Sequence, residues 1–113
     1  MKKKFRLKTQ KEINNVFLNK RRYSNKYFSL YYKDNDLDYL RFAISIGKKF
    51  GNAVSRNECK RRIRHIVRDL SRIIGNYDFV IVVRKEANEL NFQQINELIT
   101  KLIQKSKIIE TED

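Results

Sequence analysis

The residues best equipped for chemistry in this chain are basic and gather in residues 48–72. This stretch holds nine Lys and Arg residues against two acidic ones, Glu58 and Asp69. In a helix, with 100° between successive residues, six polar side chains of this stretch fall within one arc roughly 120° wide. The arc has almost no acidic partner, so its like charges repel each other unless an external anion neutralises them. Guanidinium groups suit phosphate oxygens, so the arc predicts a polyanion-binding surface, with an ordinary solvated basic face as the alternative. The arc consists of Asn57, Lys60, Arg61, Arg64, Arg68 and Arg72.

Side chains that could build a protein active site or a metal site are scarce. His65 is the single histidine, so neither a His-centred metal cluster nor a Ser-His-Asp triad can be assembled, and we expect it at the surface. Asp34, Asp36 and Asp38 have the alternate spacing of a calcium loop, but the glycine and closing glutamate of that motif are absent, which favours a turn. We therefore predict no catalytic and no metal-binding residue on the protein.

The overall charge points to nucleic acid as the partner. The 113 residues carry a formal net charge of +13, while 41% of them are hydrophobic, which predicts one folded domain over residues 1–113 with a polyanionic partner. No apolar run is long enough to span a membrane, so we expect no membrane partner. Three glycines provide no phosphate-binding loop for a small-molecule substrate. The one cysteine, Cys59, is expected in the core of a cytoplasmic protein.

Periodicity predicts a short first helix. Residues 1–8 hold five basic residues and are expected to form a mobile arm. Thr9 and Glu12 then form a capping box, and the helix is expected to run to about Asn19. Its inward-facing residues are Ile13, Val16 and Phe17.

Two longer helices follow later in the chain. The basic helix is expected over residues 53–74, ended by a left-handed cap at Gly75-Asn76. A last helix is expected from Asn91 to Lys107, before a flexible acidic tail at residues 110–113. The predicted inward-facing residues are Cys59, Ile63, Ile66, Val67, Leu70, Ile73 and Ile74 in the basic helix, and Phe92, Ile95, Leu98, Ile99, Leu102 and Ile103 in the last one.

Three strands complete the expected elements. Residues 26–33 and 39–46 alternate in hydropathy and are predicted to pair as an antiparallel hairpin, while residues 79–83 are apolar on both faces and predict an interior strand. The order is α-β-β-α-β-α, which predicts an α+β protein built as a two-layer α/β sandwich. The outer face of the hairpin mixes aromatic, small and basic residues, so it could face water or carry single-stranded RNA.

The segment from Lys49 to Arg64, KFGNAVSRNECKRRIR, closely resembles the signature of the bacterial ribonuclease P protein subunit, K-x-G-x-A-V-x-R-N-x-x-K-R-x-x-R. The resemblance implies a sandwich of the ribosomal protein S5 domain 2-like kind, with a left-handed βαβ crossover around the basic helix. Physical rules alone predict a right-handed crossover for parallel strands.

The resemblance also implies a function. In the family, an RNA subunit with bound Mg²⁺ removes the 5′ leader of precursor tRNA, and the small protein assists it. The contacts to ribonuclease P RNA that the resemblance implies are Arg56, Asn57, Lys60, Arg61 and Arg64. Arg68 is predicted as a further RNA contact because it belongs to the basic arc of the same helix. The implied cleft for the single-stranded leader contains Ile13, Phe17, Tyr31, Lys48, Lys49, Arg84 and Lys85.

Ile13 stands where the family more often has Phe, which removes one stacking platform from that cleft. Two alternatives remain open at this point. One is a structural RNA-binding protein of the ribosomal type, with no part in cleavage. The other is a DNA-binding protein that uses the basic helix, although no helix-turn-helix or zipper pattern accompanies it.

Overall fold

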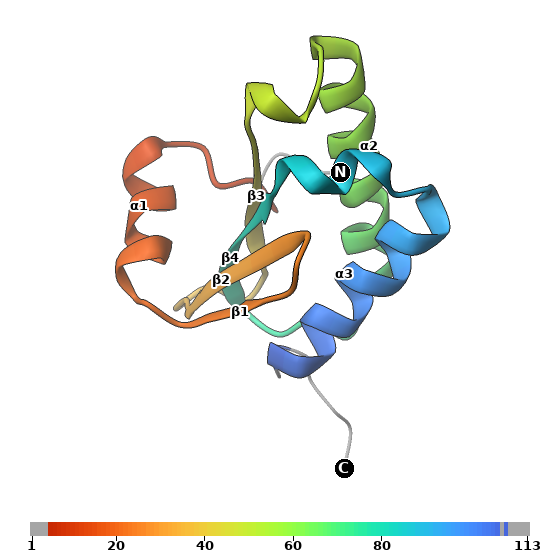
Figure 1. The fold of residues 1–113 in the computed structure, drawn as a ribbon. Coiled ribbons are helices and arrows are strands. Elements are labelled where there is room, and N and C mark those ends of the chain that lie inside the picture. The colour runs from red at the N-terminus through yellow and green to blue at the C-terminus, as the bar shows by residue number, and fades with distance from the viewer. Residues whose placement is uncertain (1–4, 107, 109–113) are drawn as a thin grey trace.

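The fold is built on a mixed four-stranded sheet with the strand order β1-β2-β4-β3. The computed structural model describes residues 5–106 and residue 108. Two helices, α2 and α3, cover one face of the sheet, and α1 covers part of the other (Figure 1). The elements are α1 (Gln10–Leu18), β1 (Arg22–Ser24), β2 (Phe28–Asp34), β3 (Arg41–Ile46), the 3-10 helix η2 (Lys48–Phe50), α2 (Ala53–Leu70), β4 (Tyr77–Val83), the 3-10 helix η3 (Lys85–Glu89) and α3 (Phe92–Ser106).

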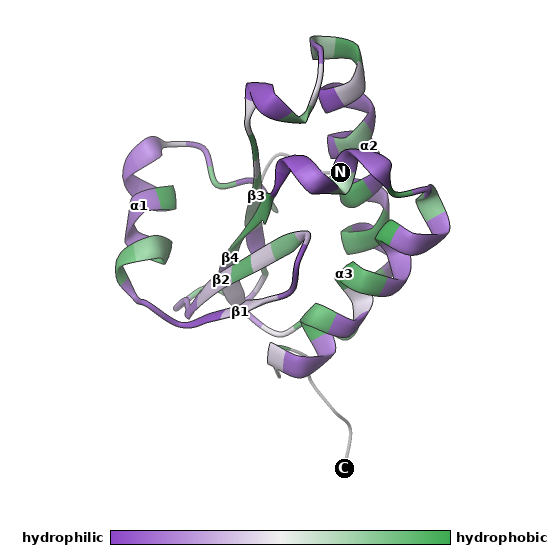
Figure 2. Cartoon of the chain, in the orientation of Figure 1, coloured by the Kyte–Doolittle hydropathy of each residue, from purple (hydrophilic) through white to green (hydrophobic). Residues whose placement is uncertain are grey.

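The main core lies between the sheet and the pair α2 and α3. Alternate residues of β2, such as Phe28 and Leu30, are fully buried there, which confirms the predicted alternation of that strand. Hydrophobic and hydrophilic residues alternate in bands along α2 and α3, as amphipathic helices require (Figure 2). The smaller core on the opposite face forms around Leu7, Val16 and Val80. Since β4 has cover on both faces, its residues are apolar on both.

The predicted hairpin of residues 26–33 and 39–46 is wrong. The two strands do not pair, because β4 lies between them. Ile81 of β4 faces Leu30 of β2 in antiparallel register and Ile44 of β3 in parallel register. A strand that is apolar on both faces is most stable in the centre of a sheet, and this outweighs the local turn residues between β2 and β3.

The N-terminal segment is more ordered than predicted. Leu7 is 6% exposed, and its backbone N–H donates to the carbonyl of Phe42 at 3.0 Å, while Arg6 forms a parallel bridge to the same residue. The expected mobile arm is therefore wrong for residues 5–8, and residues 1–4 lie outside the described residues. The Thr9–Glu12 capping box of α1 is confirmed.

Strand β1 was not expected from the sequence, because its three residues, Arg22–Ser24, are all exposed and carry no buried apolar alternation. The end of α2 also differs from the prediction. The helix stops at Leu70 and is capped by Ser71 in a right-handed conformation, and Gly75 has no positive φ. The backbone N–H of Gly75 instead donates to the carbonyl of Ile108.

The last helix begins as predicted, since Asn91 accepts a hydrogen bond from the backbone N–H of Gln94 at 2.8 Å. Two residues of the predicted inward stripes are partly outside the core, because Ile73 and Phe92 are each 40% exposed. Lys107 and the acidic residues 110–113 lie outside the described part of the chain.

Candidate nucleic-acid interface

The position of α2 makes one of its sides available for an external partner. Asn52 starts the helix by accepting a hydrogen bond from the backbone N–H of Ser55 at 2.9 Å. The helix then buries one stripe, which includes Cys59 and Ile63, against the sheet and α3. Burial raises the pKa of the Cys59 thiol to about 11, in agreement with the predicted core position. The basic side of the helix therefore faces solvent.

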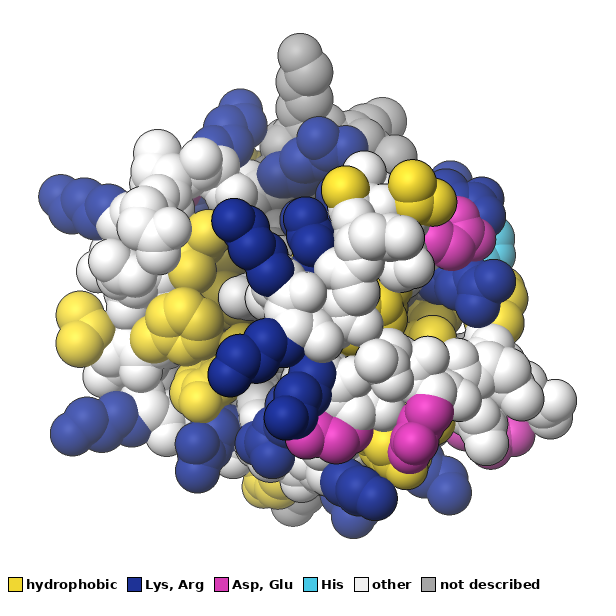
Figure 3. Space-filling model, turned by 45° about the horizontal axis from the view of Figure 1, so that its top comes forward, with side chains coloured by type: hydrophobic (Ala, Val, Ile, Leu, Met, Phe, Trp, Pro, Cys, Tyr) yellow, Lys and Arg dark blue, Asp and Glu magenta, His cyan; other side chains and the backbone are white. Residues whose placement is uncertain are grey.

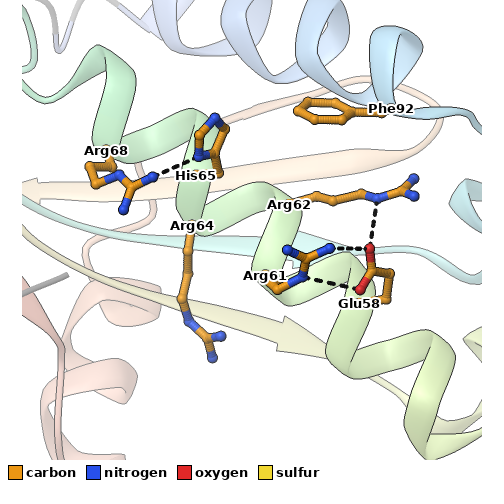
Figure 4. Close-up of a pocket in the computed structure, with 7 residues that line it drawn as sticks. All are labelled: Glu58, Arg61, Arg62, Arg64, His65, Arg68 and Phe92. Atoms are coloured by element: carbon orange, nitrogen blue, oxygen red, sulfur yellow. Dashed lines mark hydrogen bonds and ion pairs between the residues drawn. The ribbon is translucent and has the colours of Figure 1, made fainter.

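One predicted RNA contact has an acidic partner within the protein. Arg61 forms a bidentate ion pair with Glu58, with nitrogen–oxygen distances of 2.6 and 3.1 Å, and Arg62 reaches the same carboxylate at 3.3 Å (Figure 4). The expectation that the arc lacks acidic partners is therefore wrong for Arg61. Its side chain is 73% exposed in this pair, and exposed pairs are weak, so an RNA phosphate can compete with Glu58.

The other predicted contacts on α2 are less restrained. Arg56 donates from Nη1 to the carbonyl of Gly51 at 2.7 Å, which holds its guanidinium beside the start of the helix. Arg68 donates to Nδ1 of His65 at 2.7 Å, and His65 is exposed as predicted. Within the described residues, the side chains of Lys60 and Arg64 have no hydrogen bond or ion pair. Asn57 is also exposed, one residue beyond Arg56.

Three residues of the predicted leader cleft come together beside α1. The rings of Phe17 and Tyr31 meet edge to face, with their centroids 4.8 Å apart. Ile13 packs against the same small core and lines a hollow of about 250 Å³ together with Arg64 of α2. This hollow makes α1 and the basic helix neighbours on one surface. Arg22 completes the group by donating to the Tyr31 hydroxyl at 3.3 Å, a contact that sequence reasoning missed.

The four basic residues of the predicted cleft lie at one end of the sheet. Strands β3 and β4 are parallel, with Ile46 opposite Val83, so the residues that follow each strand emerge together. Arg84 donates to the hydroxyl of the buried Ser29 at 2.9 Å. Figure 3 shows a row of Lys and Arg side chains beside hydrophobic ones on this face. The exposed residues at this end of the sheet are Lys48, Lys49, Arg84 and Lys85.

Arg41 is a positioning residue that the sequence did not reveal. Its guanidinium forms a bidentate pair with the buried carboxylate of Asp78, at 3.0 and 2.7 Å, and also contacts Glu12 of α1. The hydrogen bond to Asp78 raises the pKa of Arg41, and backbone N–H groups at the start of α1 lower the pKa of Glu12. This cluster joins β3, β4 and α1, and so fixes the helix that forms one wall of the cleft.

The described residues contain no group of three or more His, Cys, Asp or Glu side chains that could hold a metal ion. Asp36 and Asp38 lie in the connection between β2 and β3, whereas Asp34 ends β2. In the same part of the chain, no helix combines the length and the apolar character needed to cross a membrane.

Comparisons with known proteins agree with this geometry. A ribonuclease P protein component from Acholeplasma laidlawii is 47% identical over 113 residues, which cover 99% of this chain and 97% of that protein. One from Streptococcus pyogenes is 34% identical over 110 residues, covering 97% and 92%. The structure of the Staphylococcus aureus RNase P protein matches with a TM-score of 0.89 at 27% identity, over 94% of this chain and 98% of that one.

The RNase P protein from Thermotoga maritima matches with a TM-score of 0.78 at 30% identity, over 88% of this chain and 96% of that one. A crossover of the opposite hand would not superimpose at these scores, so the β3–α2–β4 crossover has the same hand as in these RNase P proteins. The family model described as Ribonuclease P matches residues 1–107. The chain therefore belongs to the ribonuclease P protein family.

Proposed function

We propose that this chain acts as the protein component of ribonuclease P, which assists an RNA subunit in removing the 5′ leader from precursor tRNA. The observation that carries this proposal is the exposed basic side of α2, on which the family signature stands while the apolar side is buried. The names of the relatives over nearly the full chain support the same role.

The basic side of α2 would bind ribonuclease P RNA. Lys60 and Arg64 have no partner among the described residues, so their charges are available for phosphates without first breaking an internal bond. Each phosphate neutralised by such a residue releases a condensed counterion, which favours binding and makes it salt-dependent. Asn57 offers both a donor and an acceptor, which suits a 2′-hydroxyl or a base edge.

The cleft beside α1 would hold the single-stranded leader. Phe17 and Tyr31 provide aromatic surface on which unpaired bases stack, and the basic residues at the end of the sheet provide charge for the leader phosphates. Ile13 contributes apolar contact without an aromatic ring, so the grip at that end of the cleft rests on Phe17.

Magnesium would belong to the RNA subunit in this proposal. The protein's part is to neutralise phosphates so that RNA segments and their metal ions can approach each other. Its side chains bind and orient RNA, and none of them is assigned a step in the hydrolysis. The working place would be the cytoplasm, where precursor tRNA is processed.

Reconstitution tests this function directly. The protein alone should cleave no precursor tRNA, and its addition to a bacterial ribonuclease P RNA at low magnesium should restore cleavage. If adding the protein does not increase cleavage of precursor tRNA in that mixture, the proposed function is refuted. In the reconstituted enzyme, Phe17→Ala should weaken binding of precursor tRNA more than of mature tRNA, because only the precursor has a leader. Leu18→Ala is the matched control, since Leu18 is the next residue of α1 and is 74% exposed.

A structural RNA-binding role of the ribosomal type is the second candidate. The basic helix alone is compatible with it, but the family match over residues 1–107 favours ribonuclease P. The RNA that co-purifies with the native protein separates the two, because a ribosomal role predicts ribosomal RNA.

A further inference from the structure

A second hollow borders the basic side of α2, on the side turned toward α3. Its volume is about 470 Å³, and four arginines from α2 line it against a single acidic residue, Glu58 (Figure 4). Phe92, the first residue of α3, forms its far wall. Arg64 lines both this hollow and the one beside Ile13, so the two hollows are neighbours on the basic side of α2. The function proposed above uses the arginines of this side but gives no role to Phe92.

Phe92 is the unusual residue of this hollow. It is 40% exposed and belongs to neither hydrophobic core, although it is one of the larger apolar side chains in the chain. The guanidinium of Arg62 lies over its ring at 5.7 Å, and the ring of His65 meets it edge to face at 6.3 Å. An aromatic ring that stays partly exposed among cations is the combination that protein surfaces use to stack unpaired nucleobases.

The charges in the hollow suit the backbone of the same nucleotide. Arg61 and Arg68 reach it from positions two turns apart on α2. Their present partners, Glu58 and His65, have side chains that are 42% and 48% exposed, so a phosphate can displace them. The volume lies within the range that accommodates small ligands the size of a nucleotide.

We propose that this hollow binds one unpaired RNA nucleotide, whose base stacks on Phe92 while the phosphates that flank it contact Arg61 and Arg68. The proposal rests on the function proposed above and extends it, because RNA that lies on the basic side of α2 reaches the hollow at its edge. The nucleotide can come from ribonuclease P RNA or from precursor tRNA, and the experiment separates these sources.

The absence of tryptophan from the sequence provides a specific probe. In the Phe92→Trp variant, the only indole lies in the hollow, and a base stacked on it should quench its fluorescence. Ile73→Trp is the matched control. Ile73 is also 40% exposed and lies just after the end of α2, the helix whose arginines line the hollow, but Ile73 itself does not line it. Ribonuclease P RNA is added first, and precursor tRNA is then added to that complex. A blunt RNA duplex serves as an RNA without unpaired bases.

We expect the indole of the Phe92→Trp variant to be quenched by ribonuclease P RNA or by precursor tRNA, whichever supplies the nucleotide, and not by the duplex. Quenching by the duplex as well, or equal quenching in the Ile73→Trp variant, would overturn the proposal, since both indicate general contact without stacking. Phe92→Leu keeps an apolar side chain without a π face and should retain the unfolding temperature of the wild type. It should weaken binding of the RNA that causes the quenching about tenfold, whereas Phe92→Tyr should restore it.

Failure of this proposal is distinguishable from failure of the proposed function. If the wild-type protein supports cleavage of precursor tRNA and Phe92→Leu binds both RNAs as tightly as the wild type, the hollow is not a nucleotide site while the function stands. If Phe92→Leu lowers the unfolding temperature and Phe92→Tyr restores stability but not RNA affinity, the ring only joins α2 to α3, and the proposal is also overturned.

Discussion

Replacement of Arg41 by methionine tests whether the ion cluster holds α1 to the sheet. Methionine keeps the aliphatic stem but removes the charge, and leaves the carboxylate of Asp78 with Asn35 as its remaining side-chain partner, at 2.9 Å. The Asp78 side chain is 5% exposed, so its charge would be buried without a cation. Removing one partner of a buried ion pair costs roughly 3–5 kcal/mol.

We take the lower end of that range, because the Arg41 side chain is itself 23% exposed and water can reach the cluster. A loss of about 3 kcal/mol lowers the unfolding temperature of a domain of this size by roughly 12 °C. Most small domains retain a folded state after such a loss, because their stability is about 5–15 kcal/mol. Thermal unfolding followed by circular dichroism measures the change.

Arg21→Met is the matched control, since Arg21 pairs with Asp34 on the same sheet at 3.4 Å, with the two side chains 45% and 74% exposed. This substitution should cost less than about 1 kcal/mol. Asp78→Asn combined with Arg41→Met should recover part of the lost stability, because no unpaired charge then remains buried. Equal effects of Arg41→Met and Arg21→Met, or no recovery in the double variant, would refute the reasoning.

Three further predictions concern single side chains. Glu58→Gln should strengthen binding to ribonuclease P RNA in a filter assay and steepen its salt dependence, because it frees Arg61 and removes a negative charge; weaker binding would mean that Glu58 holds Arg61 in its RNA-binding position. The pKa of Glu12 lies below its ordinary value of 4.5 in the folded protein, so the stability that its ionised form contributes is complete above pH 4.5 and is lost as the pH falls through the lowered pKa. Thermal unfolding over that acid range should therefore show a smaller pH dependence for Glu12→Gln than for the wild type, and identical profiles would contradict the assigned role. The thiol of Cys59 is buried, with a pKa of about 11, so it should react slowly with an alkylating reagent at neutral pH until denaturant is added, and rapid labelling of the native protein would contradict the core position.

Local pattern was enough to predict most of the elements. The structure contains the capping box at Thr9 and Glu12, the apolar stripe of α2 and the alternation of β2. Each of these features depends only on residues that are close to one another in the chain. Side-chain periodicity reports which side of an element is buried, and this is a local property. The signature in residues 49–64 likewise lies on one helix and the loop before it, so the family could be inferred from the sequence.

The order of the strands was decided only by the tertiary structure. Periodicity does not state which strand lies beside which, and the choice depends on how β4, apolar on both faces, is best covered. Placing β4 between β2 and β3 makes β3 parallel to it, and this alone brings Lys48 and Arg84 to one end of the sheet. The same placement sets Arg41 opposite Asp78, a pair separated by 37 residues in the chain.

The sequence by itself thus determined a basic, amphipathic helix and the kind of partner that its charge requires. Only the folded chain decided that Arg64 of the basic helix lies beside Ile13 of α1, in one hollow. It also decided that Phe92 lies beside the arginines of α2 instead of in the core. The physical reason is the same in each case: the periodicity of a single helix or strand is a local property, whereas contacts between elements join segments that are distant in the chain and meet only after the sheet has formed.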